Sequence, residues 1–162
     1  MAGRPQGLKL DPALTAPVLQ EPVQLCARDR LGIPLEIANA APWMAERAGG
    51  DLLALAVLEA PGKIALRSWK ADSPAVLDVR RQLVDALDHQ AIRILEDKYR
   101  RVQIAKDARV TLTLSHILHL GLPPDSGAYV YVALVGEVIE ILSTDFRNQQ
   151  LARVTSMFGE LP

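Results

Sequence analysis

Two short turns carry the cationic side chains best suited to bind an anion. The first presents Arg28 and Arg30 in the segment ARDRLGIP, and the second presents Lys106 and Arg109 in KDARVTLT. A guanidinium group forms two parallel hydrogen bonds with a phosphate or with the edge of a guanine base. Charged residues also occur at turns without any function, simply because turns are exposed to solvent. The functional interpretation of these residues is contact with DNA.

Local charge favours the second turn as the phosphate-binding element. Between Arg93 and Arg109 there are six Lys or Arg residues and three acidic ones, a net charge of +3, whereas Arg28 to Glu36 is balanced. This stretch adds Arg100 and Arg101 to the candidate DNA-binding residues. The whole chain has a formal net charge of only −1, so attraction to DNA must come from such local clusters.

Other reactive residue types give weaker patterns. His116 and His119 are one helical turn apart, a spacing that can hold a metal, but no cysteine or third histidine is near them in sequence. We expect a structural or surface pair and no metal. Cys26 is the single cysteine, which excludes an intramolecular disulfide and predicts an ordinary half-buried thiol. The sequence contains no glycine-rich phosphate loop, no triad signature and no carboxylate dyad. We therefore predict that the protein is not an enzyme and has no catalytic residues, no cofactor and no small-molecule substrate.

The alternation of apolar residues predicts short strands around each turn. In the first half the predicted strands are 23–25, 31–37, 52–58 and 64–68, and in the second they are 102–104, 110–114, 128–135 and 138–142. Short helices are expected near 39–44 and 115–121, and a last one at 146–157. Between the halves, apolar residues at three-and-four spacing predict one amphipathic helix of about 40 Å that begins at Ser73-Pro74 and ends near Tyr99.

The two halves resemble each other. VQLCARDRLGIPLEI, from Val23, aligns without gaps on VQIAKDARVTLTLSH, from Val102, at an offset of 79. Four aligned positions carry the same amino acid in both segments. These residues are Val23, Gln24, Arg30 and Leu35, which align with Val102, Gln103, Arg109 and Leu114, respectively. An internal repeat is therefore predicted. It divides the chain into a proline-rich arm (1–22), a first repeat (23–70), a linker helix (71–101), a second repeat (102–145) and a helical tail (146–162), with the two repeats forming one domain.

This pattern resembles the SpoVT-AbrB family of swapped-hairpin barrels, and within it the MraZ proteins, over about residues 23 to 142. In that family each unit resembles the following order of elements: a strand, an Asp-x-x-x-Arg turn, a strand ending in proline, a short helix and a turn into a hairpin. Here Arg30 and Pro34, then Gly50-Asp51, fit the first unit, and Arg109 and LGLPPDSG fit the second. The resemblance implies an α+β fold, a pseudo-two-fold swapped-hairpin barrel with a long connecting helix. It also implies a homo-oligomeric, cytoplasmic and nucleoid-associated transcriptional regulator that binds promoter DNA repeats.

Three positions depart from the family pattern. The motif's Asp is Cys26 in one unit and Ala105 in the other, the Gly before the Arg is Asp29 or Ala108, and the proline of the second unit is Thr113. Because that Asp orients the Arg in the family, an alternative stays open, which is an oligomeric protein-interaction scaffold that has lost sequence-specific DNA binding. An enzyme would instead need a closed pocket lined by Cys26, His116 or His119. No apolar run approaches the roughly 18 to 20 residues of a membrane helix, so no membrane partner is expected.

Overall fold

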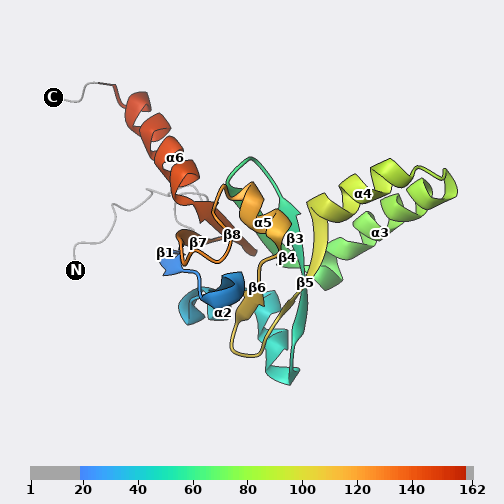
Figure 1. The fold of residues 1–162 in the computed structure, drawn as a ribbon. Coiled ribbons are helices and arrows are strands. Elements are labelled where there is room, and N and C mark those ends of the chain that lie inside the picture. The colour runs from blue at the N-terminus through green and yellow to red at the C-terminus, as the bar shows by residue number, and fades with distance from the viewer. Residues whose placement is uncertain (1–18, 160–162) are drawn as a thin grey trace, which may run out of the picture.

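The computed structural model describes residues 19–159, and the fold is α+β as predicted. Eight antiparallel strands form a nearly closed, barrel-like sheet, and helices project from it on two opposite sides (Figure 1). Most of the predicted arm, residues 1–18, lies outside the described part of the chain. The rest of it, residues 19–22, belongs to the first strand, in which Leu19, Glu21 and Val23 are half-buried. No helix in the described part is long and apolar enough to cross a membrane.

The elements fall into two similar series. The first is β1 (Leu19–Gln24), η1 (Ala27–Asp29), β2 (Arg30–Gly32), α2 (Leu35–Ala40), η2 (Pro42–Gly49), β3 (Leu52–Leu58) and β4 (Lys63–Ser68), followed by the helices α3 (Trp69–Asp85) and α4 (His89–Lys98). The second is β5 (Tyr99–Ile104), β6 (Arg109–Thr111), α5 (Leu114–His119), β7 (Tyr129–Val135) and β8 (Val138–Ser143), followed by α6 (Thr144–Met157).

The strand pairing interleaves the two series. The order is β1-β7-β8-β4-β3-β5-β6-β2, and a bridge between Cys26 and Arg30 joins the ends of β1 and β2. Exchanging the first four strands for the last four leaves this circular order unchanged. The registers agree as well, since Val23 lies opposite Val130 between β1 and β7, and Val102 lies opposite Ala54 between β5 and β3. Each series therefore completes the sheet of the other.

Hydrogen bonds between the two series follow the offset of 79 found in the sequence. Ile33 N donates to Ala108 O (2.9 Å), and the corresponding Leu112 N donates to Asp29 O (3.0 Å). The matching glutamines act in the same way: Gln24 Nε2 donates to Gly127 O (3.0 Å) and Gln103 Nε2 donates to Asp51 Oδ2 (2.6 Å). Each glutamine thus fastens the loop that leads into β7 or β3 of the other series.

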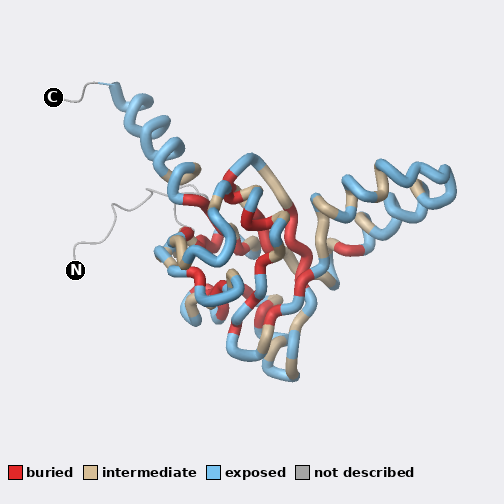
Figure 2. The backbone as a smooth tube through the Cα atoms, in the orientation of Figure 1, coloured by how far each residue is buried: buried red, intermediate tan, exposed pale blue. Residues whose placement is uncertain are grey.

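The core fills the inside of the sheet (Figure 2). It takes alternate residues of the long strands, because successive side chains of a strand point to opposite faces. Ala54 and Ala56 of β3 face inward, whereas Leu55 and Val57 face outward into a second, smaller cluster that α3 covers with Trp69.

The predicted single helix from Ser73 to Tyr99 is wrong, because the chain folds back on itself there. Ser68 caps α3 by accepting a hydrogen bond from Ala71 N (3.2 Å), so Pro74 lies inside this helix rather than at its start. The break falls at Leu87, whose φ is 55°, and Asp88 then caps α4 through Ala91 N (3.0 Å). The three-and-four spacing of apolar residues continues through both helices, since their apolar faces meet, and it cannot reveal the turn.

Two predicted strands are too long, because both end in helices. The predicted strand 31–37 stops at Gly32 and α2 starts at Leu35, and the predicted strand 110–114 stops at Thr111 before α5. Of the apolar residues that appeared to alternate there, Ile33, Ile37 and Leu112 are buried, whereas Leu35 and Leu114 are exposed at the starts of the two helices. α5 begins after its N-cap Thr113, slightly earlier than the predicted helix near 115–121. In contrast, the hairpin β3–β4 and its Pro-Gly turn lie where the sequence predicts them.

Replacing Gly62 by alanine is expected to cost about 2 to 4 kcal/mol of unfolding free energy. Gly62 has a φ of +89°, and an added Cβ would lie 2.6 Å from Ser143 Oγ, the N-cap of α6. Urea denaturation measures this. Gly32→Ala is the matched control, expected to change stability by less than about 1 kcal/mol because nothing lies within 4 Å of its Cβ. Equal losses of unfolding free energy in the two variants would contradict the role given to the positive φ of Gly62 and to its close approach to Ser143.

Candidate nucleic-acid interface

Arg30 and Arg109 lie on one exposed face of the barrel. Their strands β2 and β6 pair so that Arg30 is opposite Thr111 and Arg109 is opposite Gly32. Residues opposite each other, or two apart on one strand, share a face, and the alternating Leu31 and Val110 are buried. The two arginines therefore point outward together, one from each turn.

A third arginine joins them. Arg101 on β5 lines the same open cleft as Arg30 and Arg109, a cleft of about 560 Å³. Its guanidinium lies over the ring of Trp69, 5.9 Å from the centroid, and this cation–π contact favours an ordered side chain. The cleft also contains two carboxylates, those of Asp51 and Asp107, so its three arginines leave a formal charge of +1.

Arg28 and Lys106 occupy the tips of the two turns, both exposed. The first tip is tied to the other repeat: Arg28 N donates to Asp125 Oδ1 (2.8 Å), and Asp125 N donates to the carboxylate of Asp29 (3.0 and 3.1 Å). These bonds hold Arg28 and Asp29 at positive φ, 62° and 54°. Lys106 has no such contact among the described residues; its turn is closed by bonds within itself and accepts one from Ile33 N at Ala108 O.

Arg100 is not part of this face. Neighbouring residues on a strand point to opposite sides, so Arg100, opposite Ala56, turns inward while Arg101 turns outward. Its Nη2 lies 3.3 Å from Asp97 Oδ1, and its Nε is buried without a hydrogen-bond partner in the described part of the chain. The sequence-predicted residues that the fold brings together are therefore Arg30, Arg101 and Arg109, with Arg28 and Lys106 at the two turn tips.

Arg100 instead lies near a buried histidine. His116 is 0% exposed and forms a capping box with Thr113, in which Nδ1 accepts a hydrogen bond from Thr113 N (3.1 Å). The neutral ring therefore carries its hydrogen on Nε2. Burial, and then the charge of Arg100, lower the pKa of His116 from 6.5 to about 4. In the first series the positions at the offset of 79 are Pro34, which has no N–H to satisfy, and Ile37.

The other two candidate reactive residues have different surroundings. His119 Nε2 donates to the carbonyls of Ala60 (2.9 Å) and Lys63 (3.1 Å) and so fastens α5 to the β3–β4 turn. Cys26 is exposed rather than half-buried, because it follows the inward-facing Leu25 on the strand. Within residues 19–159, no three His, Cys, Asp or Glu side chains gather as a metal site would require.

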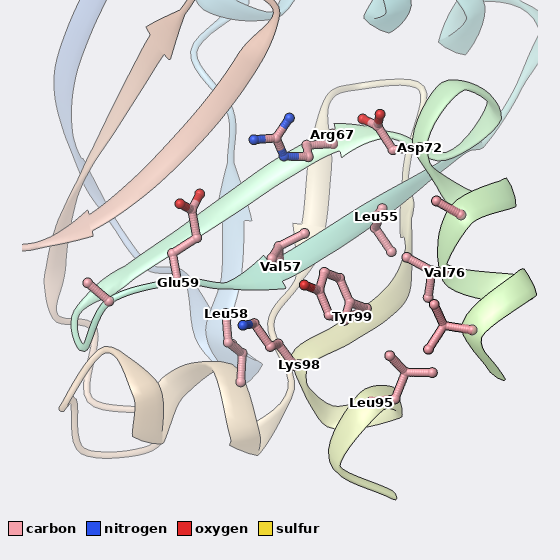
Figure 3. Close-up of a pocket in the computed structure, with 13 residues that line it drawn as sticks. Leu55, Val57, Leu58, Glu59, Arg67, Asp72, Val76, Leu95, Lys98 and Tyr99 are labelled. Atoms are coloured by element: carbon pink, nitrogen blue, oxygen red, sulfur yellow. The ribbon is translucent and has the colours of Figure 1, made fainter. Parts of the chain in front are cut away.

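A second depression, a groove of about 760 Å³, lies between the outer face of the sheet and the helices α3 and α4. Figure 3 shows Leu55 and Val57 of β3 beside Tyr99, Val76 and Leu95, which form an apolar floor. Charged side chains of both signs surround this floor: Glu59, Arg67, Asp72 and Lys98.

Several residues of the arginine cleft were not anticipated from the sequence. Asp107 pairs with Arg109, Asp51 accepts from Gln103, and Thr111 and Thr113 complete the lining. Gln103 also lines the cleft, and its coincidence with Gln24 in the aligned segments was the signal that could have identified it. Comparison of the chain with protein-family models gave no match, and comparison with curated proteins gave none either.

Proposed function

We propose that this protein is a DNA-binding transcriptional regulator of the SpoVT-AbrB type, similar to MraZ, and that it acts without catalysis. The observation that carries the proposal is the common exposed face of Arg30 and Arg109, one from each repeat, with Arg101 in the same cleft. Three guanidinium groups on one face suit contact with consecutive phosphates or with guanine edges.

We further propose that the barrel consists of two swapped-hairpin units. In support, β2 and β6 pair symmetrically, with Leu31 opposite Val110 at the offset of 79. The pairs β1–β7 and β5–β3 correspond to each other, and Ser68 and Ser143 cap the helix that follows each unit. Such a pseudo-two-fold arrangement brings the two Arg-bearing turns next to each other, which a simple tandem of separate units would not do.

The proposed regulator acts as a homo-oligomer on repeated promoter sites. The arginine face of one chain is small, and its two carboxylates reduce the net attraction. Several copies bound to neighbouring sites raise the overall affinity, because each later contact is made at a high effective concentration.

The proposal is tested by titrating the protein with fluorescent duplex DNA from upstream of its gene at several salt concentrations. We expect saturable binding whose logarithmic affinity falls linearly with the logarithm of salt, with a slope of about −0.9 for each phosphate contact. An equimolar scrambled duplex measures non-specific binding. Absence of binding at about 50 mM salt, or an affinity that salt does not change, would exclude the proposed function.

A second candidate function is a protein-interaction scaffold of the same fold. The groove beside α3 and the exposed apolar residues of α6, among them Leu151, Val154 and Met157, favour it, since apolar surface of this kind marks binding sites. The absence of an acid at Cys26 and Ala105 also favours it. The scaffold predicts assembly without DNA binding, so the salt titration combined with light scattering separates the two candidates.

A further inference from the structure

The two interface arginines are each held at Nε by a group from their own turn. Arg30 Nε donates to Ala27 O at 3.3 Å, and Arg109 Nε lies 3.4 Å from Asp107 Oδ2. Between described residues, neither side chain forms a hydrogen bond or an ion pair through its terminal nitrogens. The Nη pair of each arginine is thus free to form the planar fork that suits a phosphate or a guanine.

Asp107 makes a second contact with the same residue. Its Oδ1 accepts a hydrogen bond from Arg109 N at 3.3 Å. One carboxylate therefore bridges the backbone and the side chain of Arg109 and restricts the angle between them. Ala105, where the Asp-x-x-x-Arg pattern would place an acid, lines the same cleft and supplies only a methyl group.

We propose that Asp107 is the positioning residue for Arg109, taking over the role of the acid that is absent at Ala105. This inference rests on the proposed function, because positioning matters only if Arg109 binds DNA. Asp107 itself does not contact the ligand. It holds Nε and leaves the terminal nitrogens directed outward, whereas Arg30 is held by the neutral carbonyl of Ala27.

The first test uses the free protein. In nitrogen-15 NMR spectra of the arginine side chains, Asp107→Ala is expected to speed the exchange of the Arg109 Nε hydrogen with water and to increase its mobility. The Arg30 Nε signal serves as the internal reference. Asp107→Asn keeps the size of the side chain but removes the charge of the ion pair, so it should behave like Asp107→Ala, whereas the double variant Ala105→Asp/Asp107→Ala should keep the wild-type behaviour. An Arg109 signal that is unchanged in Asp107→Ala would overturn the proposal.

The second test measures affinity for the same upstream duplex. Both side chains of the pair are about half exposed, 53% and 60%, so Asp107→Ala is expected to weaken binding by only roughly two- to fivefold. Asp107→Asn should weaken binding to a similar extent, because the side chain keeps its size but the ion pair that positions Arg109 is lost. Tighter binding by Asp107→Ala would make Asp107 a competitor of phosphate and would overturn the proposal. If the wild type binds no DNA, the proposed function fails, while the NMR result still decides whether Asp107 holds Arg109.

Discussion

DNA binding is expected to disappear when Arg30 and Arg109 are both replaced by alanine. The two side chains are the central cations of the proposed interface, one from each series of strands, and they share one exposed face. Each bidentate contact with guanine contributes about 1 to 3 kcal/mol, so losing both reduces affinity by roughly a factor of thirty or more. Because both side chains are exposed, the unfolding free energy should change by less than about 1 kcal/mol.

Electrophoretic shift and fluorescence titration with the upstream duplex measure this effect. The matched control is Arg81→Ala/Arg153→Ala, which removes the same charge from α3 and α6, neither of which lines the cleft. If only overall charge mattered, the two double variants would weaken binding equally. Binding by Arg30→Ala/Arg109→Ala at wild-type affinity would refute the assignment of the site. A single substitution should lower the magnitude of the salt slope by about 0.9.

The second large effect is a loss of stability on acidification, caused by His116. In the unfolded chain this side chain takes up a proton near pH 6.5, whereas in the folded protein burial and Arg100 keep its pKa at about 4. Between these values the unfolded state binds more protons, so stability falls as the pH falls. The shift corresponds to a loss of about 3 kcal/mol between pH 7 and pH 4.

Urea denaturation at a series of pH values measures this loss. Thr113→Pro/His116→Ile places in the second repeat the two residues that the first repeat has at Pro34 and Ile37. This double variant should lack the His116 contribution to the pH dependence and retain most of the stability at pH 7. His116→Ile alone should be less stable by about 1 to 3 kcal/mol, because Thr113 N loses its acceptor.

The control for the pH series is His89→Gln, since His89 is exposed at the start of α4. Its pH dependence should match the wild type. If the double variant lost stability between pH 6.5 and pH 4 as steeply as the wild type, His116 would not be the titrating group.

The sequence predicted correctly those elements whose own residues specify the local structure. The Pro-Gly turn and the alternation on either side of it predicted β3 and β4, and the offset between Val23 and Val102 predicted that the Arg-bearing turns are equivalent. The break at Leu87 was missed because an amphipathic pattern continues unchanged when two helices face each other. The start of α2 at Leu35 was missed because Ile33, Leu35 and Ile37 alternate as in a strand, although Leu35 is exposed in the folded protein.

The candidate site was predictable in its residue types and not in its geometry. Consecutive arginines such as Arg100 and Arg101 look identical in sequence, and only the register of β5 against β3 separates the inward side chain from the outward one. The contact of Asp107 with Arg109 depends on the conformation of a turn in which Ala108 has a φ of 65°. The family pattern places an acid at the position of Ala105, so it gives no reason to consider Asp107, two residues later, as a partner of Arg109.

The interleaved strand order also has a consequence for synthesis of the protein. β1 pairs with β7, so Leu19 finds its neighbour Leu134 only after most of the chain has left the ribosome. Until then β1 lacks its partner strand, whereas the β3–β4 hairpin, the α3–α4 pair and the pairing of β3 with β5 can already form. Closing so long a loop is slow, since its entropy must be lost before the contact forms. During translation the nascent chain therefore exposes the unpaired β1 until β7 emerges, and exposed strand edges of this kind favour aggregation.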